Sequence, residues 1–232
     1  MFGSECFRYY RSLTDPSVYD EIFGCLDNHD QKIRVPRMGI EAVLRVFREV
    51  LLDNPGIFYV DGVSYSVRED SIDLIPRYSF DKKEIEDTEY SLKKRAERIV
   101  SGLRGKPDPV SAVHDFLVGS VTYKFEKRRY SHEIYGVLHH GIGVCEGISK
   151  TAKLLLDLME IECAVIVSEP NGNVSHAWNV IWTSGCPLHY DITFDLSHRS
   201  DKKHYFGLTD EQIYTDHARP LYPAPECVGR RQ

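Results

Sequence analysis

Three side chains in the second half of the chain, Cys145, His176 and Asp191, have the chemical types needed for nucleophilic catalysis. The residues after Cys145 place apolar side chains at helical spacing, which predicts that the thiol lies at or near the first turn of a helix. The positive end of a helix dipole stabilises an adjacent anion by about 0.3–1 kcal/mol, so this position favours the nucleophilic thiolate. Position alone leaves a second interpretation open, because a cysteine there can also be a small buried core residue.

His176 and Asp191 are expected on neighbouring antiparallel strands joined by a tight turn. With Thr183-Ser184 as the loop, the two residues lie directly opposite each other, with Cβ atoms about 4.5–5.5 Å apart. With Ser184-Gly185 as the loop, they are offset by one diagonal. A carboxylate there can accept a hydrogen bond from the imidazole Nδ1–H, fix the tautomer and support the imidazolium. The alternative is an ordinary hydrogen-bonded pair within a sheet, which register alone does not exclude.

The elements that must position these side chains are a buried helix and an antiparallel meander. Helical spacing begins after Gly141 and continues to Met159, with apolar side chains off the main face as well, which predicts burial on more than one side. Three β-rich runs follow, with an Asn171-Gly172 turn between the first two: CAVIVS, HAWNVIW and LHYDITF. A helix followed by such a meander indicates an α+β fold.

Upstream, the pattern predicts a helix, a hairpin and two further helices. The first helix, over residues 39–51, stops at the sequence DNPG, and Asp61-Gly62 is the expected turn of the hairpin IFYVDGVSYSV. The other expected elements are a short strand over 71–75, a helix over 88–103, a helix opened by Pro109 with Asp108 as its cap, and a loop over 124–132. We therefore divide the chain into a smaller N-terminal α/β extension, residues 1–85, and a larger domain, residues 86–232, that carries the three chemical side chains.

The composition is that of an ordinary globular protein and argues against several function classes. The 232-residue chain has 42% apolar residues, 29 basic and 35 acidic side chains, and a net charge of −6. A mildly acidic chain without a long basic stripe is poorly suited to bind nucleic acid. No stretch is apolar enough for a membrane helix, and the first residues lack the apolar core of a signal peptide. We therefore expect a cytoplasmic protein with no nucleic-acid or membrane partner, whose six widely spaced cysteines are free thiols.

The three motifs GVCEG, SHAWNVIW and HYDITFD, in this order, resemble the transglutaminase-like superfamily of papain-type folds. They hold Cys145, His176 and Asp191 in the local settings typical of the superfamily's cysteine, histidine and aspartate. The resemblance covers roughly residues 109–223, about half of the chain. It implies a papain-like core in which the helix that carries the nucleophile packs on an antiparallel sheet.

The resemblance also implies a role for each residue. Cys145 is the nucleophile, His176 deprotonates it and later protonates the leaving amine, and Asp191 orients His176. The substrate is then a peptide or protein, attacked at a peptide bond or a glutamine side-chain amide to give a thioester. We expect hydrolysis, as by a cysteine peptidase or amidase. Transfer of the acyl group to an amine, as by a transglutaminase, and a non-catalytic peptide-binding module of the same fold are the alternatives.

The second donor of the oxyanion hole is the least defined part of this prediction. The backbone N–H of Cys145 is one donor, but the six residues before it contain neither the glutamine of papain-type enzymes nor the tryptophan of animal transglutaminases. The candidates for oxyanion or substrate binding are Tyr123, Tyr135, His139, His140 and Trp178. Of these, Trp178 is expected on the face of His176, either as a wall of the imidazole or as a core aromatic. No pattern of metal ligands is present, so we expect neither a metal nor a cofactor. The natural substrate and the oligomeric state stay open.

Overall fold

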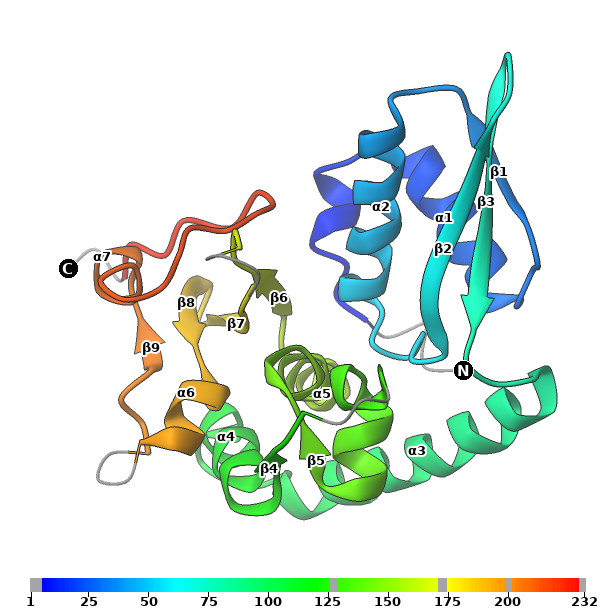
Figure 1. Cartoon of the computed structure of the whole chain (residues 1–232). Coiled ribbons are helices and arrows are strands. Elements are labelled where there is room, and N and C mark those ends of the chain that lie inside the picture. Colours follow the sequence, from blue (N-terminus) through cyan, green and yellow to red (C-terminus); the bar gives the residue numbers. More distant parts are fainter. Residues whose placement is uncertain (1–5, 126–128, 171–174, 199–201, 230–232) are drawn as a thin grey trace. The chain divides into compact units, whose positions relative to one another are not determined.

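The computed structural model describes residues 6–125, 129–170, 175–198 and 202–229. The chain divides into two compact units, residues 1–93 and residues 94–232, which are described separately below (Figure 1). The boundary falls between Lys93 and Lys94 of helix α3 (Lys82–Leu103), and the boundary that the sequence pattern predicts, after residue 85, lies earlier in the same helix. Among the described residues, no helix combines the length and the apolar character needed to cross a membrane.

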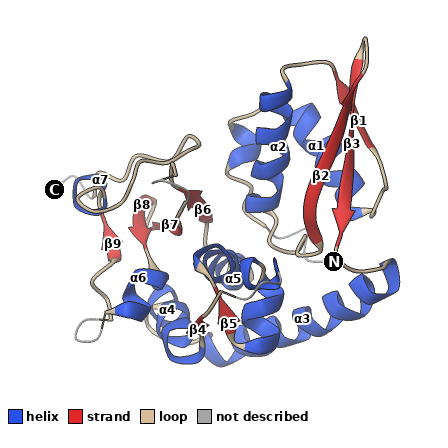
Figure 2. Ribbon diagram, in the orientation of Figure 1, coloured by secondary structure: helices blue, strands red, loops and turns tan. Residues whose placement is uncertain are grey.

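The first unit packs two helices beside a three-stranded antiparallel sheet (Figure 2). Its elements are η1 (Tyr10–Ser12), α1 (Pro16–Asp27), β1 (Ile33–Pro36), α2 (Ile40–Asp53), β2 (Val60–Val67) and β3 (Ser71–Tyr78), and the strand order is β1-β3-β2. Helix α2 follows the amphipathic pattern that predicts it, because its core face buries apolar residues such as Val43, Phe47 and Val50.

The predicted hairpin turn at Asp61-Gly62 is wrong. The two residues lie inside strand β2, where the pairing with β3 is irregular between Val60 and Gly62. The chain turns instead between Val67 and Ser71, and the Arg68 N–H donates to the Ser71 carbonyl at 2.9 Å. A glycine in the interior of a strand often marks a β-bulge. The pair Asp61-Gly62, which otherwise favours a tight turn, here forms part of such a bulge.

Helix α3 begins at Lys82, earlier than the predicted start at residue 88. The reason is a reciprocal pair of hydrogen bonds at its start: the Asp81 N–H donates to Glu84 Oε2 at 2.9 Å, and the Glu84 N–H donates to Asp81 Oδ1 at 2.8 Å. This arrangement is a capping box with aspartate in place of serine or threonine, and it satisfies two backbone donors that the helix itself leaves unpaired.

The second unit has a four-stranded antiparallel sheet of order β6-β7-β8-β9, so the α+β prediction is confirmed. Its helices are α4 (Pro109–Ser120), η2 (Arg129–His132), the π-helical η3 (Gly136–His140), α5 (Cys145–Asp157), α6 (Ile192–Ser197) and α7 (Asp210–Ile213). Its strands are β4 (Thr122–Tyr123), β5 (Ile142–Gly143), β6 (Cys163–Val167), β7 (Ala177–Thr183), β8 (Cys186–Tyr190) and β9 (Phe206–Leu208). Strands β4 and β5 form a separate parallel pair.

Helix α5 is the central element of this unit. All of its residues from Gly147 to Asp157 are buried, as its apolar pattern predicts. It packs against β6 and β7, and α4 and α6 pack against it (Figure 1). Two lysines are buried with it, and each has an acidic partner: Lys150 Nζ lies 2.7 Å from Glu133 Oε1, and Lys153 Nζ lies 2.9 Å from Asp157 Oδ2. These pairs explain how a helix with cationic residues stays in the core.

Helix α4 begins at Pro109 as predicted, and the Asp108 side chain caps it by accepting from the Ser111 N–H. Two other predictions meet segments that are only partly described. The expected loop over 124–132 ends in the short helix η2, and residues 126–128 lie outside the described residues. The predicted Asn171-Gly172 turn also lies outside them.

The last predicted strand, LHYDITF, ends earlier than expected. Strand β8 stops at Tyr190, and the next residues form helix α6, whose N-cap is Asp191. The hairpin before it pairs Thr183 with Cys186, so the loop is Ser184-Gly185, the second of the two registers that the sequence allows. Both loop residues have left-handed φ angles, +53° and +77°, as a tight hairpin turn requires.

Candidate active site

Cys145 is the first residue of helix α5, and its thiol is half-buried. The preceding residue, Val144, is extended, and its N–H donates to the Ser131 carbonyl at 2.9 Å. The next turn of the helix also packs tightly on this segment, because a Cβ at Gly147 would lie 2.4 Å from the Ser131 carbonyl oxygen. The start of α5 is therefore fixed against residues 131–133, and Cys145 stands where the helix dipole favours an anion.

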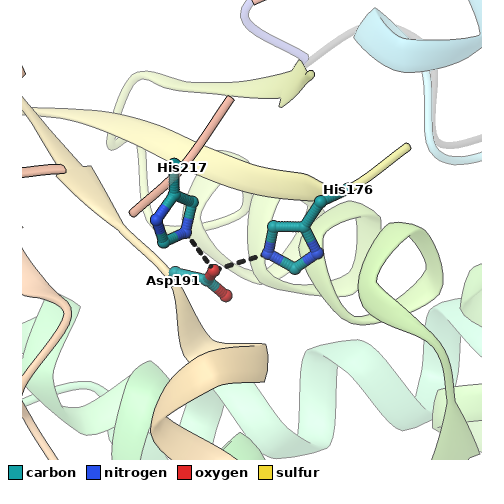
Figure 3. Close-up of side chains that lie close together, drawn as sticks. All are labelled: His176, Asp191 and His217. Carbon is teal, nitrogen blue, oxygen red and sulfur yellow. Dashed lines mark hydrogen bonds and ion pairs between the residues drawn. The ribbon is translucent and has the colours of Figure 1, made fainter. Parts of the chain in front are cut away.

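His176 and Asp191 come together at one end of the β7–β8 hairpin. His176 directly precedes β7, Asp191 directly follows β8, and His176 Nε2 lies 2.6 Å from Asp191 Oδ2 (Figure 3). The expected contact through Nδ1 is wrong, because the ring turns its Nε2 to the carboxylate. This orientation leaves Nδ1 as the ring nitrogen available to a thiol.

The charges around the imidazole favour its protonated form. Burial lowers the pKa of His176, but hydrogen bonds with the side chains of Asp191 and Cys145, together with their charges, outweigh burial and raise the pKa to about 9. For Asp191, burial acts in the opposite direction and raises the pKa of the carboxyl group. Hydrogen bonds from His176 and from a second histidine, His217, outweigh burial, so the pKa of Asp191 is lowered from its usual value. The three residues singled out in the sequence thus lie together, with His176 between the carboxylate and the sulfur.

Trp178 is both a core aromatic and a wall of the imidazole. It is fully buried, and its Nε1–H donates to His189 Nδ1 at 2.9 Å. Its ring lies nearly parallel to that of His176, with an interplanar angle of 20° and a centroid distance of 6.0 Å. The two interpretations that the sequence left open therefore describe one residue.

The remaining candidates separate into one residue near the triad and a group beyond it. Tyr123 lies in β4 opposite Gly143 of β5, and it is 54% exposed. Burial and the negative charges of Cys145 and Asp191 raise the pKa of Tyr123, which places its hydroxyl in the field of the triad.

His139, His140 and Tyr135 instead form an aromatic cluster with Tyr130. His139 and His140 stack with their rings 5.0 Å apart, and in the described part of the chain these ring contacts do not include His176. The cluster therefore lies apart from the imidazole of the triad.

His217 is a residue of the site that the sequence analysis missed. It is buried, and its Nε2 lies 2.8 Å from Asp191 Oδ2, the same oxygen that contacts His176 (Figure 3). It follows Asp191 by 26 residues and comes after α7, in a stretch without regular periodicity. No spacing rule connects such a loop residue to the end of a strand, so only the folded chain reveals the contact.

Two groups of side chains in the described residues have metal-ligand chemistry: His176 with Asp191 and His217, and His189 with Asp210 and Cys227. In both groups, the atoms that could bind a metal are already engaged in hydrogen bonds. In the second group, His189 Nδ1 accepts from Trp178, so in the neutral ring its Nε2 carries the proton and donates to Asp210 Oδ1 at 2.8 Å. A metal at that nitrogen would have to displace this proton, so the group fits a hydrogen-bonded link better than a metal centre.

Residues 93–191 match the sequence model of the transglutaminase-like superfamily, a range that contains Cys145, His176 and Asp191. None of the curated proteins matches the chain. Similar solved structures include a TGase, with 14% identity and a TM-score of 0.40 over 58% of this chain and 44% of that one. A proposed cysteine protease from Cytophaga hutchinsonii has 12% identity and a TM-score of 0.38, over 58% of this chain and 62% of that one. A proposed protease from Parabacteroides distasonis has 10% identity and a TM-score of 0.34, over 56% and 36%. The chain thus matches between 36% and 62% of the lengths of these three structures.

Proposed function

From the match of residues 93–191 to the transglutaminase-like superfamily, we propose that this protein is a cysteine hydrolase that acts on peptide or glutamine-type amides through Cys145, His176 and Asp191. Members of the superfamily are typically cysteine hydrolases or acyltransferases, which supports thiol-dependent acyl chemistry in general. The observation that carries the proposal is the position of His176, whose Nε2 lies 2.6 Å from the buried Asp191 carboxylate and whose pKa is raised by both Asp191 and the nearby Cys145.

In the proposed reaction, the Cys145 thiolate attacks the carbonyl carbon of the amide, and the carbonyl oxygen becomes an oxyanion. The His176 imidazolium then donates its proton to the leaving nitrogen, the C–N bond breaks, and an amine or ammonia departs from the thioester. Neutral His176 next takes a proton from water, whose oxygen attacks the thioester carbon. The C–S bond breaks, the acid product leaves, and the thiolate–imidazolium pair is restored.

Asp191 keeps the imidazole oriented during both proton transfers. It is fully buried, and its contact with Nε2 fixes the ring and leaves Nδ1 for the exchange of a proton with Cys145. The stacked Trp178 limits the tilt of the same ring. These contacts hold the general base in place without requiring that Asp191 itself become protonated.

Stabilisation of the oxyanion is the step for which the chain offers the fewest hydrogen-bond donors. Cys145 is the first residue of α5, so the helix provides no carbonyl for its backbone N–H, which is free to stabilise the oxyanion. Tyr123 is the proposed second donor, since it is the candidate whose hydroxyl feels the charge of Cys145. Tyr123→Phe removes only that hydroxyl, and loss of one such donor is expected to lower kcat by roughly 10²-fold. Unchanged kcat in this variant would leave the oxyanion with a different second donor.

Alkylation by iodoacetamide tests the nucleophile directly. Cys145 is expected to react first and well below pH 8, because it faces an imidazole with a raised pKa. Cys186 is the matched control, since its thiol is half-buried like that of Cys145 but lies in β8. Peptide mapping after brief treatment measures both rates. Equal rates at Cys145 and Cys186 would rule out a catalytic thiol and favour the non-catalytic binding module.

A second experiment separates hydrolysis from transfer. A glutamine-containing peptide is supplied with and without a primary amine, and Cys145→Ala serves as the inactive control. Release of ammonia or a cleaved peptide with no amine incorporated supports the proposed hydrolase. Incorporation of the amine into the peptide by the parent protein, and not by Cys145→Ala, would make the protein an acyltransferase instead.

A further inference from the structure

Asp191 receives two histidines on one carboxylate oxygen. His176 Nε2 lies 2.6 Å and His217 Nε2 lies 2.8 Å from Asp191 Oδ2, while Asp191 Oδ1 accepts the Phe194 N–H at 3.0 Å (Figure 3). The carboxylate is fully buried. Only one of the two histidines, His176, contacts the Cys145 side chain in the catalytic arrangement described above.

His217 is itself held from behind by a chain of hydrogen bonds that returns to Asp191. Its Nδ1 lies 2.6 Å from Asp216 Oδ1, and Asp216 Oδ2 accepts the Tyr205 hydroxyl at 2.6 Å. The Tyr205 carbonyl in turn accepts the backbone N–H of Asp191 at 2.9 Å. The circuit therefore fixes the His217 ring relative to both the backbone and the side chain of Asp191.

The second histidine matters because the first one changes charge during the reaction. When His176 gives its proton to the leaving group, its attraction for the buried carboxylate weakens. A buried carboxylate without donors tends to take up a proton or rotate, and either change would misplace the general base. A donor that does not take part in the proton transfer keeps the carboxylate in place at that moment.

We propose that His217 is a positioning residue, whose Nε2–H holds the Asp191 carboxylate ionised and oriented toward His176 throughout the catalytic cycle. Asp216 and Tyr205 hold the His217 ring for this task. The inference rests on the proposed function, because it assumes that His176 serves Cys145. The titratable groups that face His217 among the described residues are Asp191, Asp216, His176, His189 and Tyr205, and the rings of Phe194 and Trp178 pack against it.

Another buried histidine provides a matched control for purely structural damage. His114 of α4 also lies between two carboxylates, with Nδ1 3.0 Å from Asp115 Oδ1 and Nε2 3.0 Å from Asp195 Oδ2. Its side chain is 2% exposed and that of His217 is 1% exposed, so the two differ little in burial. The described hydrogen bonds of the His114 ring do not include Asp191. Replacement by phenylalanine removes the same chemistry at both positions, but it removes a direct contact with the Asp191 carboxylate at position 217 alone. His114 is linked to Asp191 through Asp195, whose N–H donates to the Asp191 carbonyl.

The test compares His217→Phe, His217→Gln and His114→Phe in the full chain, with the rate of iodoacetamide alkylation at Cys145 measured across pH. His217→Phe is expected to lower the rate at neutral pH by about tenfold or more, as for loss of a hydrogen bond to a charged group, and to move the acid limb of the profile to higher pH. His217→Gln keeps an N–H donor and should recover most of the rate. His114→Phe should retain the profile of the parent even if its Tm falls.

The proposal is overturned if His217→Phe keeps the parent profile, or if His217→Gln is as impaired as His217→Phe. Should His217→Phe fail to fold, Asp216→Asn carries the test, because the side chain of Asp216 is 44% exposed and the change weakens its contacts with His217 and with the Tyr205 hydroxyl, which support the His217 ring. A smaller loss of rate in the same direction is then expected, and an unchanged profile overturns the proposal.

Proton NMR separates failure of this inference from failure of the proposed function. In Cys145→Ala, which has no nucleophile, the proton between His176 and Asp191 is expected as a strongly downfield resonance, and His217→Phe in that background should shift or broaden it. An unreactive Cys145 in the parent sinks the proposed function and leaves this measurement interpretable. A resonance unchanged by His217→Phe sinks the role of His217 alone.

Discussion

Each unit of the protein holds a buried carboxylate among basic side chains, Asp73 in the first unit and Asp191 in the second, and the two arrangements differ in these partners. In the first unit, Asp73 of β3 accepts from Arg34 at 2.7 Å and from Arg68 at 2.6 Å. In the second unit, Asp191 accepts from His176 and His217. Arginine stays protonated at every physiological pH, so the first arrangement is a fixed electrostatic link between strands. Histidine can gain and lose a proton near neutrality, so the second can take part in a reaction.

Exposure adds to this difference. The guanidinium side chains of Arg34 and Arg68 are 55% and 53% exposed, whereas the imidazoles of His176 and His217 are 21% and 1% exposed. Water can therefore replace the arginines in part, but it reaches the histidines much less. A buried carboxylate thus indicates function when its partners are titratable and shielded, and indicates structure when they are permanently charged and solvated.

The sharpest contrast between the units is expected from removal of one partner. His176→Ala should lower amide turnover by roughly 10³-fold or more, because no other described group contacts both Asp191 and Cys145. Arg34→Ala should leave turnover at the level of the parent. Release of ammonia or amine from a glutamine-containing peptide measures both variants. A comparable loss of turnover in Arg34→Ala would show that the first unit contributes to the reaction.

Replacement of each carboxylate by an amide should give opposite outcomes in the two units. Asp191→Asn is expected to lower turnover by about 10²–10⁴-fold and to leave residual activity, because the imidazole is then misoriented. Asp73→Asn should keep turnover and lower the free energy of unfolding only modestly, because the hydrogen bonds that it weakens are to exposed arginines screened by solvent. Kinetics and urea denaturation of both variants provide the comparison. Asp191→Asn with the turnover of the parent would show that Asp191 does not orient His176.

The smallest expected effect is a pH dependence of stability with opposite sign in the two units. The pKa of His176 is raised to about 9 in the folded chain, since contacts with Asp191 and Cys145 outweigh burial. An unfolded histidine titrates near pH 6.5, so the stabilisation by His176 is fully present below about pH 6.5 and is lost as pH rises toward 9. Hydrogen bonds from Arg34 and Arg68 lower the pKa of Asp73, so its stabilisation is present above about pH 3.9 and is lost as pH falls.

Difference measurements isolate the two contributions. The free energy of unfolding of the parent minus that of His176→Gln should decrease between pH 6.5 and 9, and the decrease should be smaller in a Cys145→Ala background, where one cause of the raised pKa is missing. A difference that rises or stays flat over this range contradicts the raised pKa of His176. The same subtraction with Asp73→Asn should stay flat there and change only in acid.

Much of the second unit could be predicted from local pattern. The helical spacing after Cys145 and the short, mostly apolar runs of β6 and β7 predict elements whose burial is set by their own residues, and the capped start at Asp108 is a local interaction. The approach of His176 to Asp191 follows from a short hairpin, in which sequence distance fixes spatial distance. These predictions needed no information about the rest of the chain.

The features that the sequence could not predict depend on competition between two local structures or on contacts between residues that are far apart in the sequence. The alternation of residue types predicts Asp191 to be part of a strand, because it does not show that the Asp191 carboxylate accepts the Phe194 N–H and caps α6. Which imidazole nitrogen meets Asp191 depends on the rotamer of His176 and not on its position in the sequence. The contact with His217 joins a loop to a strand end, and no local rule applies to it.

The two carboxylate oxygens of Asp191 have different partners: Oδ1 caps helix α6 by accepting the Phe194 N–H, and Oδ2 contacts His176 and His217. Descendants of this protein that abandoned the chemistry would still need a side chain able to begin that helix. We expect them to carry asparagine, serine or threonine at this position far more often than alanine or a larger apolar residue. Loss of reactivity would then be visible first at Cys145 or His176, while position 191 drifted slowly among helix-starting residues.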